Sequence, residues 1–171
     1  YPTVPHGDKA GWARLKAKAP FFVPFMGAEG PELSASKTVE AATYPYPVLM
    51  TYSNIDAGQV YAMTKAMVEL FPDYKDAAPG NGGWDIKRQV FDWVVPVHEG
   101  AIKYFKEINV WKPEYDKSNA ALIERQKVLA DAWTAHSKGS HASEEAFNKA
   151  WMKARSDALT KAKMEPVLTE W

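Results

Sequence analysis

The side chains best suited to acid–base or metal chemistry in this sequence are its four histidines, His6, His98, His136 and His141. Imidazole titrates near neutral pH and is the commonest metal ligand in proteins. His136 and His141 lie close in sequence, but a predicted helix ends between them, so they do not share a helix face. A zinc site needs three or four converging ligands, and no cluster in the sequence supplies them. We therefore predict no metal site.

Other catalytic signatures are also missing from the sequence. No Gly-rich loop follows a strand in the phosphate-cradling pattern, and no Gly-x-Ser-x-Gly nucleophile elbow occurs. Cysteine is absent, which excludes thiol nucleophiles, disulfides and Cys-based zinc sites. Glu144 and Glu145 are adjacent carboxylates, which do not converge on a helix. We predict that the protein is not an enzyme and uses no cofactor; a small hydrolase is disfavoured because no nucleophile–base pair has a recognisable spacing.

The length of 171 residues and the composition are those of an ordinary globular protein, and we expect a single domain with one hydrophobic core. The 21 basic residues equal the 21 acidic residues, which argues against a nucleic-acid partner because phosphate neutralisation needs a clustered basic surface. No apolar run is long enough to span a membrane. The sequence starts at Tyr1 without a leader, so we expect a processed chain or a fragment from which a signal peptide has been removed.

The first half of the sequence predicts a helix, two extended segments and a second helix. Asp8 can cap a helix through about Lys18, and FFVPF at 21–25 reads as a short strand or extended segment at an edge or hinge. The clearest strand is at 43–54, with Val48 to Tyr52 buried on both faces. Asn54 or Asp56 then caps a helix over about 57–71.

The second half predicts mostly helix. One or two helical turns are expected within 84–93, and Ser118 or Asn119 caps a long helix to about Ser137. Ser143 caps the last helix, which Pro166 ends. A short polar turn at 138–142 joins the two long helices, which predicts an αα-hairpin.

The stretch that organises these elements is PVHEGAIKYFKEINVW at 96–111. A histidine and a glycine open a short amphipathic helix, which by itself is typical of an ordinary surface helix. His98 at the helix start is expected to be a neutral hydrogen-bonding partner with a structural role. The stretch also resembles the C-terminal signature of the TAXI family, the solute-binding receptors of tripartite (TRAP) transporters. Glu99 stands where that family usually has proline, and Asn109 stands where it has glycine, a mild change because Asn tolerates the left-handed conformation.

The resemblance extends upstream, over roughly residues 12–111. In the family, a Pro-x-x-Gly segment leads out of the second lobe, and a Pro-rich crossover strand returns to the first lobe before a helix. The present sequence has the same order, with FFVPFMGAEGPEL, then YPYPVLMTY, then VYAMTKAMVELF. The resemblance implies an α/β fold class. The chain would be the helix-rich C-terminal part of a two-lobe periplasmic-binding-protein (type II) fold, with a C-terminal αα-hairpin extension. Residues 1–42 would be the tail of the second lobe, 43–112 the crossover strand and C-terminal helices of the first lobe, and 113–171 the hairpin extension. The family fold is about twice this length, so the N-terminal half of the first lobe is expected to be missing.

The function implied by this resemblance is that of a periplasmic receptor that captures a small organic acid or amino acid and delivers it to membrane subunits of a transporter. Aromatic and glycine residues near strand ends suit a cleft for a small carboxylate, so we predict Phe25, Gly27, Tyr44 and Tyr46 as ligand-binding residues. The alternative interpretation is structural: these residues belong to a Pro-kinked loop that packs on its own core. Expected partners are the N-terminal half of the receptor or a second copy, and no nucleic acid. The alternative function is a mostly helical structural or interaction module without a small-molecule ligand.

Overall fold

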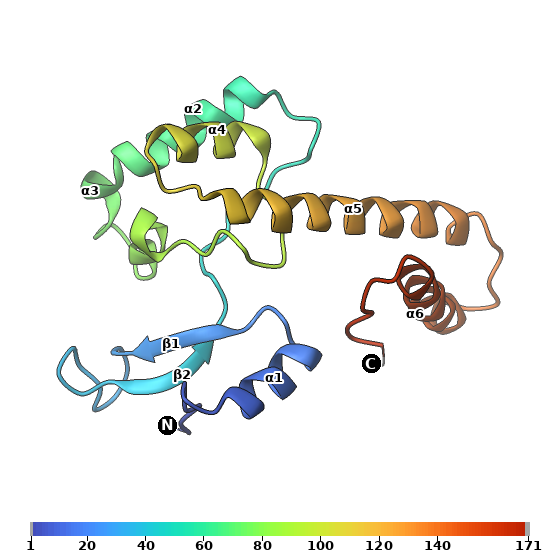
Figure 1. Cartoon of the computed structure of the whole chain (residues 1–171), viewed down its shortest axis with the longest axis horizontal. Coiled ribbons are helices and arrows are strands. Elements are labelled where there is room, and N and C mark those ends of the chain that lie inside the picture. Colours follow the sequence, from blue (N-terminus) through green and yellow to red (C-terminus); the bar gives the residue numbers. More distant parts are fainter. Residues whose placement is uncertain (1, 170–171) are drawn as a thin grey trace. The chain divides into compact units, whose positions relative to one another are not determined.

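The computed structural model describes residues 2–169 and is rich in helix, with one two-stranded sheet (Figure 1). The chain forms two compact units: one joins the residues up to Ala42 with those from Ala121 onward, and the other comprises Thr43–Ala120. The elements in chain order are α1 (Lys9–Lys18), β1 (Val23–Gly27), β2 (Val39–Thr43), α2 (Ala57–Glu69), α3 (Phe71–Tyr74), η1 (Asn81–Trp84), η2 (Ile86–Arg88), α4 (Glu99–Glu107), α5 (Pro113–His136) and α6 (Glu144–Lys161).

Helix α1 begins and ends where the sequence predicts. The Asp8 carboxylate accepts a hydrogen bond from the Gly11 N–H at 2.8 Å, which satisfies a backbone donor of the first turn. Trp12 is buried, its indole N–H donates to the Pro5 carbonyl at 3.1 Å, and its ring meets the His6 ring edge-on. The proline-rich lead-in is thus held against α1.

β1 lies two residues later than the short strand or extended segment predicted at 21–25, whereas β2 lies earlier in the chain than the second predicted strand. β1 includes Pro24 and reaches Gly27, and it pairs with β2 across a loop closed by a Ser34–Lys37 bridge. Val4 donates its N–H to the Glu40 carbonyl at 2.9 Å and so extends the pairing beside β2. Strand β2 was not expected, because the sequence places the second strand at 43–54.

The predicted strand at Val48–Tyr52 is wrong. These residues follow β2 as an extended segment outside any strand, with Met50 73% and Tyr52 81% exposed instead of buried. Pro45 and Pro47 lack the N–H groups that a ladder needs, and no other strand of the described chain lies beside this segment. An apolar run of β-forming residues makes a strand only when a neighbour supplies the other half of the hydrogen bonds.

The second helix, α2, is confirmed, and Asp56 is its cap. The Asp56 carboxylate accepts from the Gln59 N–H at 3.0 Å. α2 ends at Glu69, two residues before the predicted Phe71. The short helix α3 follows with Pro72 in its first turn, where a missing N–H costs nothing. Of the one or two turns expected within 84–93, η2 is present, whereas η1 lies before that range and ends at Trp84.

Helix α5 starts earlier than predicted. Ser118 and Asn119 are not its caps but lie inside it, because the helix begins at Pro113, a favoured first position. Acidic residues Glu114 and Asp116 occupy the first turn, where the helix dipole favours negative charge.

Helix α6 begins as predicted, with the Ser143 hydroxyl accepting from the Ala146 N–H at 3.1 Å. Its Leu159 is completely buried. Residues 121–136 of α5 run across Figure 1, whereas α6 is seen almost end-on, so the two helices do not lie side by side as in the predicted antiparallel hairpin. They meet through aromatic side chains, with the rings of Trp133 and Trp151 4.9 Å apart.

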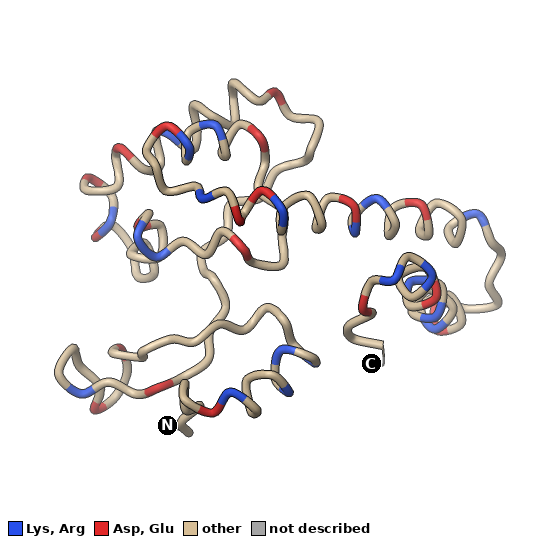
Figure 2. Tube along the Cα trace, viewed as in Figure 1, with Lys and Arg blue, Asp and Glu red and all other residues tan. Residues whose placement is uncertain are grey.

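Acidic and basic residues are interspersed along the described chain, as α5 shows clearly (Figure 2). The extended residues 44–55 carry no charged side chain. None of the helices in residues 2–169 combines the length and apolar character that a membrane crossing requires.

Candidate functional site

The turn at His98 and Gly100 is the best-defined feature of the predicted signature. His98 caps α4: its Nδ1 accepts a hydrogen bond from the Gly100 N–H at 3.1 Å. This contact satisfies one of the backbone N–H groups that have no partner inside the first turn of α4. The sequence argument for a structural role of His98 is therefore supported by its contacts.

Gly100 is needed because α2 and α4 approach each other closely at this turn. A Cβ atom at Gly100 would lie 2.3 Å from the Ala57 carbonyl oxygen and 3.0 Å from the Tyr61 nitrogen. Both are backbone atoms that cannot move aside. The signature glycine thus sets the distance between the first turn of α4 and the first turn of α2.

The other end of α4 closes as the sequence suggests. Asn109 has φ 58°, the left-handed conformation that glycine adopts most readily at the end of a helix. The N–H groups of Val110 and Trp111 then donate to the Phe105 carbonyl at 3.0 and 3.2 Å. The Asn109 turn directs Trp111 back into the unit, where it is buried.

A polar contact joins the exposed edges of α2 and α4. The Tyr61 hydroxyl donates to the Glu107 carboxylate at 2.6 Å, and this hydrogen bond is the main reason that the pKa of Tyr61 is raised, with burial second. The Tyr61 ring meets the buried Tyr104 ring edge-on. Lys103 lies 5.0 Å from the centre of the Tyr61 ring.

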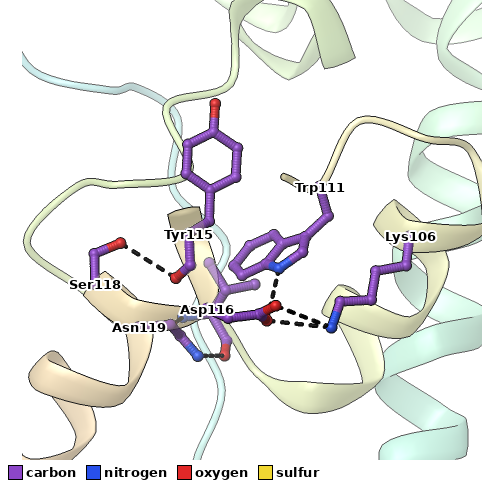
Figure 3. Close-up of polar contacts among 7 residues, drawn as sticks. Lys106, Trp111, Tyr115, Asp116, Ser118 and Asn119 are labelled. Atoms are coloured by element: carbon purple, nitrogen blue, oxygen red, sulfur yellow. Dashed lines mark hydrogen bonds and ion pairs between the residues drawn. The ribbon is translucent and has the colours of Figure 1, made fainter. Parts of the chain in front are cut away.

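The start of α5 is anchored to α4 by a second polar group (Figure 3). The indole N–H of Trp111 donates to Asp116 at 2.9 Å, and the Lys106 ammonium lies 3.1 Å from the same carboxylate oxygen. The hydrogen bond from Trp111, followed by that from Lys106, lowers the pKa of Asp116. These contacts fix the direction in which α5 leaves the signature.

Asn119 joins α5 to Val97, which lies just before α4. Its side-chain oxygen accepts from the Val97 N–H at 2.7 Å, and its amide nitrogen donates to the Val97 carbonyl at 3.2 Å. Asn119 is buried, so both backbone groups of Val97 are satisfied away from water. The sequence reading missed this role and that of Asp116; Pro113 followed by acidic residues was the available signal of an earlier helix start.

The four predicted ligand-binding residues fall in two different compact units. Phe25 is half-buried and Gly27 is buried on β1, in one unit. Tyr44 and Tyr46 lie at the start of the other unit, and their side chains are 51% and 70% exposed. Gly27 closely approaches β2, since a Cβ there would be 3.2 Å from a Val39 methyl group. That this set lines one cleft stays a prediction.

The segment that carries Tyr46 rests on a glycine pair. A Cβ at Gly83 would lie 2.1 Å from the Tyr46 carbonyl oxygen, and one at Gly80 would lie 3.4 Å from the Tyr46 ring. Gly80 has φ 88°, a conformation that favours glycine. The backbone of Tyr46 and Pro47 is thus supported by the η1 turn, while the tyrosine ring faces solvent.

Comparison with known proteins gives one family. The model of the NMT1-like family matches residues 6–108, a range that contains α1, both strands, α2 and α4. No curated protein and no solved structure matches the chain. NMT1-like proteins are periplasmic-binding-protein-like, with solute binding instead of catalysis as their general function. Because the match covers more than half of the chain, this protein belongs to the NMT1-like family.

Proposed function

We propose that this protein is a solute receptor of the TAXI type and acts as the C-terminal part of a two-lobe, type II binding protein. It captures a small organic acid or amino acid in the periplasm and delivers it to the membrane subunits of a tripartite transporter. The observation that carries the proposal is the family match over residues 6–108 together with the structure of the signature turn inside that range. His98, Gly100 and Asn109 each have a geometric reason to be of their residue type.

The proposed mechanism is closure of two lobes about crossover segments. The chain passes between its compact units twice, after Ala42 at the end of β2 and after Ala120 within α5. The first passage has no helical hydrogen bonds and can absorb changes in backbone angles, as hinges do. Affinity for the solute then depends on the difference between its contacts in the open and closed states.

The proposed ligand-lining residues are Phe25, Gly27, Tyr44 and Tyr46. Support comes from the exposure of both tyrosine rings next to the passage between the units, while the backbone beneath Tyr46 is held by Gly83. An exposed aromatic ring on a supported backbone offers contact area with little loss of conformational freedom on binding.

The extended residues 44–55 also support the proposal that a partner covers them, either the N-terminal half of the receptor or a second copy. The segment is uncharged and exposes large apolar side chains, including Leu49, Met50 and Tyr52. The same feature favours the alternative function, a helical interaction module without a small ligand, since exposed apolar stretches serve protein contacts as well.

The experiment that tests the proposal is calorimetric titration of the complete receptor with a panel of small organic acids and amino acids. We expect one class of solute to bind, and Tyr46→Ala to weaken that binding about tenfold, ~1.4 kcal/mol. Tyr52→Ala is the matched control, because Tyr52 lies on the same segment, is more exposed and is not among the proposed lining residues.

Two results would contradict the proposal. If no solute of the panel binds the folded receptor, the interaction-module alternative is favoured. If Tyr46→Ala and Tyr52→Ala reduce affinity equally, Tyr46 does not line the site. Thermal unfolding of both variants should match that of the wild type, because substitutions of exposed side chains change stability by about 0.5 kcal/mol or less.

A further inference from the structure

All the sulfur atoms of this chain are methionine thioethers, because the sequence has six methionines and no cysteine. Peroxides oxidise thiols and thioethers by two-electron chemistry, so in this protein such sulfur oxidation is confined to methionine. The rate at each thioether depends on whether a peroxide can reach the sulfur from solvent. The methionines are therefore distinguished first by their exposure.

Met50 is the most exposed methionine of the described chain. Its exposed fraction is 73%, against 50% for Met63 on α2 and 47% for Met26 on β1. Three further methionines are half-buried, namely Met67, Met152 and Met164. The Met152 sulfur also accepts a hydrogen bond from the Arg155 guanidinium at 3.7 Å, which occupies a lone pair that would otherwise attack a peroxide.

Met50 lies near the middle of the extended residues 44–55, which carry no charged side chain. Leu49 and Tyr52 beside it are exposed as well. The backbone at Met50 belongs to no helix or strand, so regular hydrogen bonding does not hold its sulfur against the rest of the unit. A change of polarity at Met50 therefore alters an uncharged, predominantly apolar surface.

We propose that Met50 is a site of reversible oxidation by peroxides, and that its sulfoxide releases a second copy of this chain from residues 44–55. A lone pair of the Met50 sulfur attacks one peroxide oxygen and forms the S–O bond while the O–O bond breaks. The hydroxide that leaves takes the proton of the transferred oxygen, so the products are the sulfoxide and one water. The sulfur loses two electrons, which the peroxide gains. A methionine sulfoxide reductase reverses the step with a dithiol, which becomes a disulfide as water is released.

The sulfoxide acts on association because it makes a flexible apolar side chain polar. Burial of its oxygen against another chain removes hydrogen bonds to water, which is unfavourable without a new partner. A second copy fits residues 44–55 because charge does not oppose it: the segment is uncharged, and the chain has 21 basic and 21 acidic residues. The inference rests on the proposed function in one respect, that a partner covers these residues.

The first measurement is peptide mapping by mass spectrometry after timed treatment of the 171-residue chain with hydrogen peroxide. We expect Met50 to be oxidised about threefold faster than Met63 and about tenfold faster than Met152. Sedimentation velocity of the same samples should show that oxidation raises the dissociation constant of the dimer about tenfold. Methionine sulfoxide reductases for both sulfoxide epimers, supplied with dithiothreitol, should restore the original constant.

Met50→Leu is the decisive variant, because leucine keeps an apolar side chain of similar volume and cannot form a sulfoxide. This variant should associate as the wild type does and should not respond to peroxide. Met50→Gln imitates the polar sulfoxide and should weaken association without peroxide. Met63→Leu is the matched control on α2 and should leave the peroxide response unchanged.

The proposal is overturned if Met63 or Met26 is oxidised as fast as Met50. It is also overturned if peroxide dissociates the Met50→Leu variant as it does the wild type. Both results would leave the covering partner of residues 44–55 in place. A wild-type chain that is monomeric before any oxidation would instead contradict that partner, and the oxidation switch with it.

Discussion

The Nδ1 atom of His98 accepts a hydrogen bond from the N–H of Gly100 at 3.1 Å, and this contact starts α4 at the point where α4 meets α2. The pairing explains two residues of the signature at once. His98 satisfies a backbone donor of the first helical turn, and Gly100 has no side chain that would separate the two helices. The residues from His98 to Gly100 thus both cap α4 and allow it to pack closely against α2.

Gly100→Ala should destabilise the protein. The added methyl group would lie 2.3 Å from the Ala57 carbonyl oxygen, so α4 must move away from α2. We expect a loss of about 1–3 kcal/mol in the free energy of unfolding, the usual cost of overpacking. Chemical denaturation measures it, with Gly7→Ala as the control, because nothing lies within 4 Å of a Cβ at Gly7. Equal stability of the two variants would contradict the close approach.

Asn109→Gly should stabilise the protein, and Asn109→Ala should destabilise it. Asn109 has φ 58°, which glycine adopts without strain and alanine does not. We expect a gain of up to about 1 kcal/mol for glycine and a loss of about 1 kcal/mol for alanine. The midpoint of urea unfolding reports both. A loss of stability with glycine would show that the Asn109 side chain makes a contact worth more than the relief of strain.

The ionisation of Asp116 should make the junction of α4 and α5 sensitive to acid. Its pKa is lowered in the folded protein, first by the Trp111 hydrogen bond and then by Lys106. The stabilisation is therefore present above the ordinary carboxyl pKa of 3.8 and is lost as the pH falls through the lower folded value. Asp116→Asn keeps an oxygen acceptor for Trp111 and removes the charge, so its stability should fall less between pH 4 and about pH 2.

The measurement for Asp116 is denaturation at several pH values, followed by tryptophan fluorescence. Asp131→Asn is the control, because Asp131 lies on the solvent face of the same helix. If both variants and the wild type lose stability in parallel, the carboxylate of Asp116 is not linked to folding. Trp111→Phe should reduce the acid sensitivity as well, since it removes the larger of the two causes.

The extended residues 44–55 should mediate association. Val48, Leu49, Met50 and Tyr52 are 41%, 57%, 73% and 81% exposed, and the segment has no charge to oppose contact with another chain. We expect the isolated chain to form dimers or larger species at micromolar concentration. Sedimentation velocity should show Met50→Lys shifting the chain towards monomer, whereas Met63→Lys, at a half-exposed site on α2, should not. A chain that stays monomeric without any substitution would exclude this expectation.

The starts of α1, α2 and α6 were predictable from the sequence because capping is local. Asp8, Asp56 and Ser143 each bond to a backbone N–H three residues further along, and such a bond depends only on the cap and on the helix that follows it. The conformation of Asn109 was predictable for the same reason, since it is a property of one residue at a helix end.

The strand positions, the start of α5 and the contact between His136 and His141 were decided by the tertiary structure. The residues from Val48 to Tyr52 have the composition of a strand, yet a strand requires a second chain segment whose position no local pattern encodes. α5 starts at Pro113, and its first turns are held by hydrogen bonds to residues outside the helix: Trp111 donates to Asp116, and Val97 donates to Asn119. His136 and His141 become neighbours only when a loop and the aromatic face of α6 bring them together. Hydrogen bonds between residues close in sequence could therefore be predicted from short stretches of sequence. Contacts between distant residues could not, because they depend on how the whole chain packs.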